Sequence, residues 1–315
     1  MLIEATHLQK FFTLNGGRRV HAVDDVSLGI AEHEVVGLVG ESGSGKTTFG
    51  KTLIGLYDKS GGEVRYRGEV LPARYTAADF RQQASEIQII FQDPYGSLNP
   101  RMTIFEIIAE GLRLRDHCSL ASTRDKVVYW LERVGLSADH LSRYPHEFSG
   151  GQRQRVGIAR ALIVEPKLLV CDEPISALDV SVQAQVVQLL GELQESMGLS
   201  LLFIAHDLSM VRHVSDRMAV MYLGSLIELG PTEAVYFRPL HPYTQLLIAS
   251  KPEPDPAHER QRQDPLIKGE IPSPIDLKPR CRFAGRCPKA EPRCFVERPV
   301  LREVQPARLV ACHLL

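Results

Sequence analysis

The sequence lacks any long apolar run and has almost no net charge. Its longest apolar stretches, such as Val35–Val39 and Leu199–Ala205, fall far short of the roughly 20 residues that a membrane-spanning helix needs. With 37 basic and 38 acidic side chains and a formal net charge of −1, the chain has no overall basic field that would recruit nucleic acid or an anionic bilayer. We therefore expect any membrane association to be peripheral, and we expect no nucleic-acid partner.

A secretory leader is also lacking, because Met1–Ala5 contains no basic stretch followed by an apolar segment. We expect the chain to remain in the cytosol. Cysteine is scarce, with six residues in a chain of 315. A cytosolic chain of this length does not rely on a disulfide framework, and the gathering of four cysteines near the C-terminus points instead to a metal or cluster site.

Short apolar runs bounded by polar or turn residues predict strands that are buried on both faces of a parallel sheet. These runs are Val35–Val39, Leu168–Cys171 and Ser200–Ala205. Between the last two, apolar residues recur at helical spacing from Val182 to Met197, so strand, helix and strand alternate. The dipeptide Gly224-Ser225 separates two further apolar runs and predicts an antiparallel hairpin. The fold class is therefore α/β.

The middle and the end of the chain differ in residue pattern and composition. Helical patterns fill Thr103 to Ala161, with Ser122 and Asp125 placed as a helix start, and we expect a helical subdomain over about residues 93–161. After Ser250 prolines become frequent, beginning in Lys251–Pro256, and such a composition favours an extended linker. There is no internal repeat, so the chain holds one such unit and not two.

A phosphate-binding loop follows the first predicted strand directly. The spacing Gly40, four residues, Gly45, Lys46, Thr47 precedes a helix that we expect over Thr48–Leu56. Glycines let backbone N–H groups face the phosphates, and the start of the helix adds its positive dipole end. Lys46 is expected to reach the β- and γ-phosphates of a bound nucleotide, and the Thr47 hydroxyl to bind Mg²⁺. The nucleotide-binding residues expected in this loop are Gly40, Glu41, Ser42, Gly43, Ser44, Gly45, Lys46, Thr47 and Thr48.

A second strand delivers two adjacent carboxylates. Asp172 stands at the carboxyl end of the Leu168–Cys171 run, where it can hold Mg²⁺ directly or through water. Glu173 then lies beside the γ-phosphate and is our candidate general base for the attacking water. We interpret Cys171 as a residue of the core and not as a nucleophile.

The run Ser149-Gly150-Gly151-Gln152, placed shortly before this Asp-Glu strand, resembles the signature of the ABC ATPases. Residue 148 is Phe where leucine is commonest in the family. The resemblance covers residues 1–245 and implies a P-loop, RecA-like nucleotide-binding domain with an antiparallel β subdomain and a helical subdomain. It also implies a dimer, because in this family Ser149, Gly150, Gly151 and Gln152 of one cassette would cap the nucleotide held by the phosphate loop of another.

The same resemblance assigns three further residues. Gln92 resembles the glutamine that contacts Mg²⁺ and the attacking water, and Asp179 ends a loop, Ser176–Asp179, at which two cassettes meet. His206 matches the switch histidine that contacts the γ-phosphate. The implied chemistry is phosphoryl transfer from ATP to water.

The adenine ring is expected to stack on an aromatic side chain near the N-terminus. Phe12 aligns with the stacking aromatic of the family, and the neighbouring Phe11 is the alternative.

Three segments resemble one group of ABC importers, those for dipeptides and oligopeptides, which also includes nickel and some glycoside importers. They are Gln92–Pro100, Tyr144–Phe148 and Arg238–Leu247. The resemblance implies a second ABC ATPase subunit as heterodimer partner, two transmembrane permease subunits and an external solute-binding protein. It places the chain peripherally at the cytoplasmic face of the inner membrane, as the ATPase conventionally counted second.

The predicted C-terminal extension, residues 246–315, contains the four clustered cysteines. Cys281, Cys287, Cys294 and Cys312 are separated by five, six and seventeen residues. Four thiolates suit a [4Fe-4S] cluster or tetrahedral zinc, and the absence of paired C-x2-C knuckles favours the cluster. Some members of the importer group carry a [4Fe-4S] cluster there, and four unliganded thiols remain the third possibility. We expect a structural role, with the extension braced against a partner.

Two other classes of function were considered. Soluble ABC ATPases of DNA repair or translation carry a long coiled-coil insertion or two cassettes in one chain, and this sequence has neither feature. An accessory protein that binds ATP without hydrolysing it would often lack Glu173 or His206, and both are present here.

Overall fold

Four fully or largely buried strands form the centre of the structure, a computed structural model that describes residues 1–115, 120–176, 178–250 and 270–315. Three of these strands are buried at every residue: β3 (Val35–Val39), β7 (Leu168–Asp172) and β8 (Ser200–Ile204). Strands of a parallel sheet that is covered on both faces are rich in Val, Ile and Leu for this reason. They pair in parallel with one another and with β6 (Ile87–Ile90).

These strands belong to an eight-stranded mixed sheet. Its order is β11–β12–β10–β9–β3–β8–β7–β6. The remaining members are β9 (Arg217–Tyr222), β10 (Ser225–Pro231), β11 (Arg302–Gln305) and β12 (Arg308–Val310). A second, antiparallel sheet has the order β2–β1–β4–β5. Its strands are β1 (Ile3–Thr13), β2 (Arg19–Ile30), β4 (Gly61–Tyr66) and β5 (Glu69–Val70).

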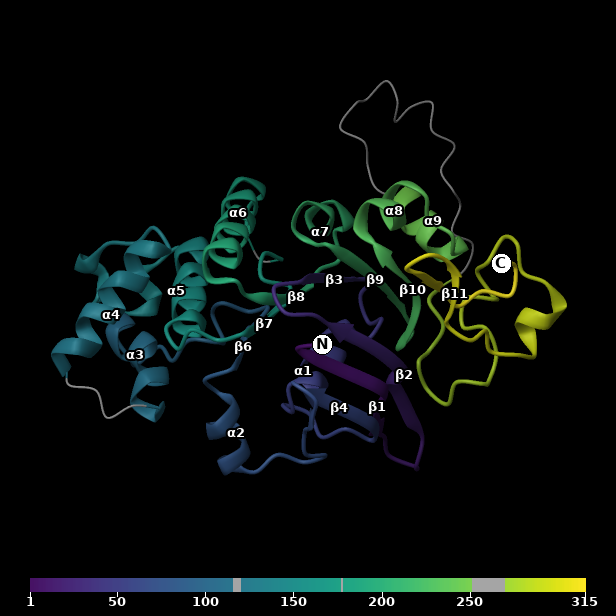
Figure 1. The fold of residues 1–315 in the computed structure, drawn as a ribbon, viewed down its shortest axis with the longest axis horizontal. Coiled ribbons are helices and arrows are strands. Elements are labelled where there is room, and N and C mark those ends of the chain that lie inside the picture. The colour runs from purple at the N-terminus through teal and green to yellow at the C-terminus, as the bar shows by residue number, and fades with distance from the viewer. Residues whose placement is uncertain (116–119, 177, 251–269) are drawn as a thin grey trace, which may run out of the picture.

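Helices cover the sheets and form a separate group at one end. The helices of eight or more residues are α1 (Lys46–Leu53), α3 (Ile104–Arg115), α4 (Leu120–Arg133), α5 (Gly150–Leu162), α6 (Val180–Met197) and α9 (Pro242–Ala249). The shorter ones are α2 (Ala77–Gln83), α7 (Leu208–Val214) and α8 (Thr232–Phe237). In Figure 1 α3, α4 and α5 lie together at the left, while the C-terminal segment lies at the opposite end.

Two apolar clusters hold these layers together. One lies between the two sheets and contains Phe49 and Leu53 of α1 together with β1, β2 and one face of the central strands. The other lies on the opposite face of the central strands and continues into the helical group, where Trp130 and Leu131 are buried. Burial of both faces of β3 fixes the position of the loop that follows it.

The predicted α/β core is confirmed, and two helix starts differ from expectation. The strands at residues 35–39, 168–171 and 200–205 are present, and β9 and β10 form the hairpin expected around Gly224. The helix α1 begins at Lys46 instead of Thr48, because Gly45 is its N-cap residue and the helix starts inside the phosphate-loop motif. The helix α4 already includes Leu120, so Ser122 lies inside the helix and is not its start. The predicted linker at 251–256 lies outside the described residues.

The end of the chain extends the central sheet. β12 pairs antiparallel with β10, with Glu228 opposite Val310. At this seam the Arg308 guanidinium donates to Glu228 Oε1 at 2.6 Å, and the two side chains are only 5% and 0% exposed. Glu228 also accepts the backbone N–H groups of Leu240 and His241. The carboxylate therefore joins the C-terminal segment, β10 and the start of α9.

Within the described residues, no helix is both long and apolar enough to cross a membrane.

We predict that Arg308→Ala destabilises the protein by about 3–5 kcal/mol, because it leaves the buried Glu228 carboxylate without its counter-charge. The measurement is the free energy of unfolding of the full chain in urea. Arg293→Ala is the matched control, since Arg293 pairs with Glu297 at the surface and its loss should change stability little. Equal destabilisation by the two variants would contradict the role given to the buried pair.

Candidate active site

The loop between β3 and α1 adopts a conformation that only glycine tolerates at two positions. Gly40 and Gly45 have φ angles of 154° and 100°. A Cβ on Gly40 would lie 2.3 Å from the Met221 carbonyl oxygen, and one on Gly45 would lie 2.1 Å from the Ala22 carbonyl oxygen. Backbone conformation and close approach together explain both glycines.

Lys46 crosses the inside of this loop. Its Nζ donates to the carbonyl oxygens of Gly40 at 2.8 Å and Glu41 at 3.0 Å, and it lies 4.0 Å from Glu173 Oε1. Burial lowers the pKa of Lys46, while the charges of Glu173 and Asp172 oppose this shift. The loop thus holds a buried cation next to the predicted general base.

The loop and β7 are joined by a hydrogen bond between the two predicted Mg²⁺ ligands. Thr47 Oγ1 donates to Asp172 Oδ1 at 2.6 Å. Burial raises the pKa of Asp172, and the Thr47 hydroxyl and the Lys51 ammonium, 3.9 Å from Oδ2, act against that rise. A hydroxyl and a carboxylate oxygen at this separation are the hard oxygen donors that Mg²⁺ prefers.

Residues that follow three neighbouring parallel strands converge on Glu173. Gln92, after β6, donates from Nε2 to Glu173 Oε2 at 2.9 Å, and His206 Nδ1, after β8, lies 3.6 Å from the same oxygen. Glu173 has a φ of 46°, which is uncommon for a residue with a side chain, and its N–H donates to the Ile204 carbonyl at 3.0 Å. The carboxylate is therefore held by fixed neighbours on each side.

A cavity of about 230 Å³ lies above the loop. Eight of the predicted nucleotide or catalytic residues line it: Ser42, Gly43, Gly45, Lys46, Thr47, Thr48, Gln92 and Glu173. Val20, Ala22 and Pro274 complete the lining. The predicted residues Gly40, Glu41, Ser44 and Asp172 belong to the loop and strand beneath, and Ser44, Lys46 and Asp172 are buried.

The two candidate aromatics point to opposite faces of β1. Phe12 pairs with Val20, which lines the cavity, and residues directly opposite in an antiparallel pair share a face. Phe12 is 37% exposed, and its ring lies 5.6 Å from the Tyr57 ring, measured between centroids. Phe11 instead pairs with His21 and packs on that ring at 4.7 Å. Phe12 therefore lies on the face of β1 that also borders the cavity, and Phe11 lies on the other face.

The signature segment lies outside this cavity. Ser149 is the N-cap of α5: its Oγ accepts the Gln152 N–H at 3.3 Å, and its N–H donates to Gln152 Oε1 at 3.0 Å. A Cβ on Gly151 would lie 2.5 Å from Val182 Cγ1. A capped helix start at the surface can bind an anion, but no residue of 149–152 lines the cavity of the same chain.

Asp179 and His206 are likewise accessible. Asp179 is the exposed N-cap of α6, next to Val180, which is 77% exposed. Ala177, in the loop assigned to contacts between cassettes, lies outside the described residues. The side chain of His206 is 60% exposed.

The four C-terminal cysteines lie near one another. Burial, together with the neighbouring thiols of Cys294, Cys287 and Cys312, raises the pKa of Cys281 to about 11. The Cys281 N–H donates to the Cys294 carbonyl at 3.0 Å. In the parts of the chain that the structure describes, no three His, Cys, Asp or Glu side chains are arranged to hold a single metal ion. Cys171 is fully buried in β7, as expected for a core residue.

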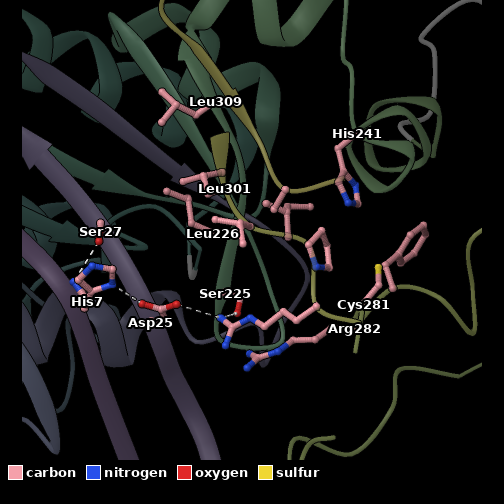
Figure 2. A pocket seen from close by; sticks show the side chains of 16 residues that line it. His7, Asp25, Ser27, Ser225, Leu226, His241, Cys281, Arg282, Leu301 and Leu309 are labelled. Atoms are coloured by element: carbon pink, nitrogen blue, oxygen red, sulfur yellow. Dashed lines mark hydrogen bonds and ion pairs between the residues drawn. The ribbon is translucent and has the colours of Figure 1, made fainter. Parts of the chain in front are cut away.

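A larger cavity, of about 400 Å³, lies away from the loop and contains none of the predicted nucleotide residues. Figure 2 shows its apolar wall of Leu226, Leu301 and Leu309, with Cys281 at one side and the His7–Asp25 pair at the other. We place the chemistry at the smaller cavity, because the buried cation, the carboxylates and the glycine loop meet there.

Comparison with known proteins agrees with this geometry. Residues 23–176 match the family model described as "ABC transporter", and residues 227–294 match "Oligopeptide/dipeptide transporter, C-terminal region". A solved dimeric cassette, MJ0796 bound to ADP and phosphate, has a TM-score of 0.68 and 27% identity, covering 73% of this chain and 98% of that one.

Curated relatives match over nearly the whole chain. The putative oligopeptide transport ATP-binding protein YkfD of Bacillus subtilis is 53% identical, over 99% of this chain and 95% of its own length. The oligopeptide transport ATP-binding protein OppF of Salmonella typhimurium is 52% identical, over 96% of this chain and 92% of its own.

The chain belongs to the ABC transporter family and is an ATPase of that family. Within the family it belongs to the group of oligopeptide transport ATP-binding proteins. The family resemblance stated from the sequence and the P-loop ABC fold are thereby confirmed.

Sequence reasoning missed one part of the cavity wall. Pro274 lies in the C-terminal segment, and its carbonyl accepts the His21 N–H at 2.9 Å, while Ile275 bridges Val20. A proline in a proline-rich stretch carries no signal for such a contact. The structure thus brings the C-terminal segment to the edge of the nucleotide cavity.

We predict that Glu173→Gln still binds ATP and dimerises but hydrolyses it about 10²- to 10⁴-fold more slowly, because the amide cannot accept a proton from water. ATP binding and phosphate release are measured on the same preparation. Glu195→Gln, an exposed change on α6, is the control. If Glu173→Gln hydrolysed ATP about as fast as the control, Glu173 would not be the general base.

Proposed function

We propose that this ATPase drives the uptake of dipeptides or oligopeptides through membrane permease subunits. The observation that carries the proposal is the match of residues 227–294 to the C-terminal region of oligopeptide and dipeptide transporters. The names of YkfD and OppF, which match almost end to end, support the same class of solute.

In the proposed reaction Glu173 Oε2 accepts a proton from the attacking water while Gln92 and His206 hold the carboxylate in place. Lys46, already buried beside Glu173, supplies positive charge to the phosphates. Thr47, Asp172 and Gln92 would hold Mg²⁺, which when bound with ATP neutralises phosphate charge. Phe12 would stack on the adenine.

We further propose that the site is completed by a second cassette. The capped start of α5, residues 149–152, is accessible but does not line the cavity of its own chain, and Asp179 is similarly exposed. A second ATPase chain would bring its own signature to this cavity. Two permeases and a solute-binding protein would complete the importer, with the chain bound peripherally at the cytoplasmic face of the membrane. Residues 1–245 would form the cassette and 246–315 its extension.

The experiment is reconstitution of the chain with its second cassette and permeases in proteoliposomes. We expect peptide-loaded binding protein to stimulate ATP hydrolysis and peptide accumulation, and we expect the isolated chain to hydrolyse ATP slowly. Stimulation by a nickel- or glycoside-loaded binding protein, without any response to peptides, would contradict the proposed solute.

We also propose that Cys281, Cys287, Cys294 and Cys312 bind a [4Fe-4S] cluster, with zinc as the alternative. None of the four is in a disulfide, and burial together with mutual repulsion raises the pKa of Cys281, Cys287 and Cys312. Thiols that resist ionisation together are stabilised as thiolates by a bound metal group.

We predict that protein purified without oxygen contains about four iron and four sulfide per chain. Iron, sulfide and zinc are measured in the wild type, in a variant with all four cysteines changed to Ser, and in Cys118→Ser as the control. Stoichiometric zinc without sulfide would show that the four cysteines bind zinc and not a cluster. The absence of both iron and zinc would show that the four thiols are unliganded.

A further inference from the structure

Glu41, the second residue of the phosphate loop, is bound by a side chain from the far end of the sequence. Arg286 donates from Nη1 to Glu41 Oε2 at 2.8 Å and from Nη2 to Oε1 at 2.9 Å. The Arg286 side chain is 5% exposed and that of Glu41 21%. The bonds to Glu41 raise the pKa of the guanidinium. A bidentate pair of this kind fixes direction as well as distance.

The backbone of the same loop residue is held twice more. The Glu41 N–H donates to Tyr243 Oη at 2.9 Å, and its carbonyl accepts from Lys46 Nζ at 3.0 Å. Tyr222 Oη accepts from Arg286 Nη1 at 3.2 Å. Glu41 therefore links the phosphate-binding lysine, α9 and Arg286 through its carbonyl, its N–H and its carboxylate.

Three aromatic side chains pack against one another next to these contacts. Tyr222, Tyr243 and Phe283 are all buried, with ring centroids separated by 4.7 Å for the tyrosine pair and 5.4 Å for each contact with Phe283. Phe283 and Arg286 belong to one short turn, in which the Cys287 N–H donates to the Phe283 carbonyl at 2.9 Å. The turn between Cys281 and Cys287 thus presents an aromatic ring and a guanidinium to the loop together.

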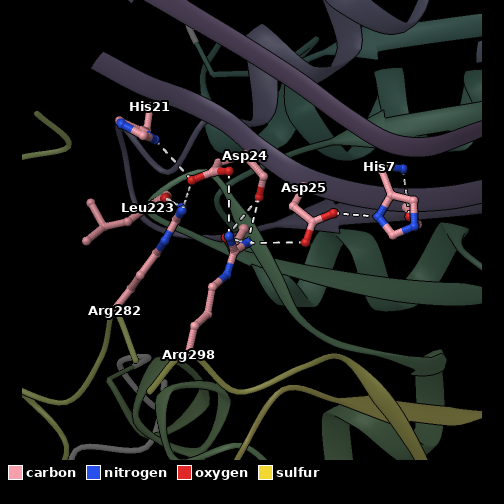
Figure 3. A network of polar contacts seen from close by, with 9 residues as sticks. His7, His21, Asp24, Asp25, Leu223, Arg282 and Arg298 are labelled. Atoms are coloured by element: carbon pink, nitrogen blue, oxygen red, sulfur yellow. Dashed lines mark hydrogen bonds and ion pairs between the residues drawn. The ribbon is translucent and has the colours of Figure 1, made fainter. Parts of the chain in front are cut away.

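A second arginine of this turn acts on the other end of the loop. Figure 3 shows Arg282 directed at Asp24 and at the Leu223 carbonyl, with Arg298 extending beside it toward Asp24. The next residue, Gly224, donates its N–H to the Ser44 carbonyl at 2.8 Å. Although burial of Asp24 raises its pKa, Arg282, His21 and Arg298 hold it below its ordinary value.

We propose that Arg286 is a positioning residue for ATP binding, and that the turn 281–287 fixes the phosphate loop in its binding conformation through Glu41. Arg286 does not line the nucleotide cavity. It acts by restricting the loop. When the loop also populates conformations that cannot bind ATP, the apparent affinity equals the intrinsic affinity multiplied by the fraction of molecules in the binding conformation. The proposal rests on ATP binding by this chain and does not depend on which solute is transported.

The test is the affinity of the full chain for Mg-ATP, measured by titration calorimetry, and the KM for ATP of the assembled transporter. We expect Arg286→Gln to raise both values about tenfold with kcat at saturating ATP nearly unchanged, and Arg286→Lys to restore part of the affinity. Arg293→Gln is the matched control, because Arg293 makes a similar two-bond pair with Glu297 in the same segment, away from the loop.

Two further variants separate positioning from general loss of structure. Glu41→Gln removes the same pair from the loop side and should weaken ATP binding by a similar factor, even where Arg286→Gln folds poorly. The double variant should be no weaker than either single one, because the second change has no pair left to break. Affinity in Arg286→Gln equal to that of Arg293→Gln, or additive effects in the double variant, would overturn the proposal.

Discussion

Parallel pairing of β3, β8, β7 and β6 is the constraint on which the active site depends. Because parallel strands end at the same edge of a sheet, the residues that follow them meet in space although they are far apart in sequence. The phosphate loop follows β3, Glu173 follows β7, Gln92 follows β6 and His206 follows β8. Burial of these strands, complete in β3, β7 and β8, fixes this register, and no side chain of the site has to be positioned by a long loop of its own.

Attachment of the C-terminal segment follows a different physical principle. It contributes few buried apolar side chains, among them Phe283 and Val310, and is joined to the rest of the molecule largely by arginine–carboxylate pairs. Arg282 and Arg298 meet Asp24, Arg286 meets Glu41, and Arg308 meets Glu228. Each pair is directional, so the segment is held in one orientation against the loop, the hairpin and α9.

The sequence was informative where the signal is local. Apolar runs predicted the buried strands, and the glycine spacing predicted a loop whose φ angles and close contacts require glycine. Contacts of the C-terminal segment could not be predicted in this way. An arginine such as Arg286 has no local pattern that identifies its partner, and the short strands β11 and β12 depend on pairing with β10 for their existence. The start of α1 was placed two residues late because Gly45 serves both the loop and the helix.

The pair between Glu41 and Arg286 spans 245 positions of sequence. Chains fold progressively from the N-terminus as they are synthesised. The strands and glycines of the phosphate loop therefore leave the ribosome long before the turn that holds Glu41. With the role proposed for Arg286, a nascent cassette has its phosphate loop before the restraint on it, so full affinity for ATP would arise only after the turn 281–287 has been made.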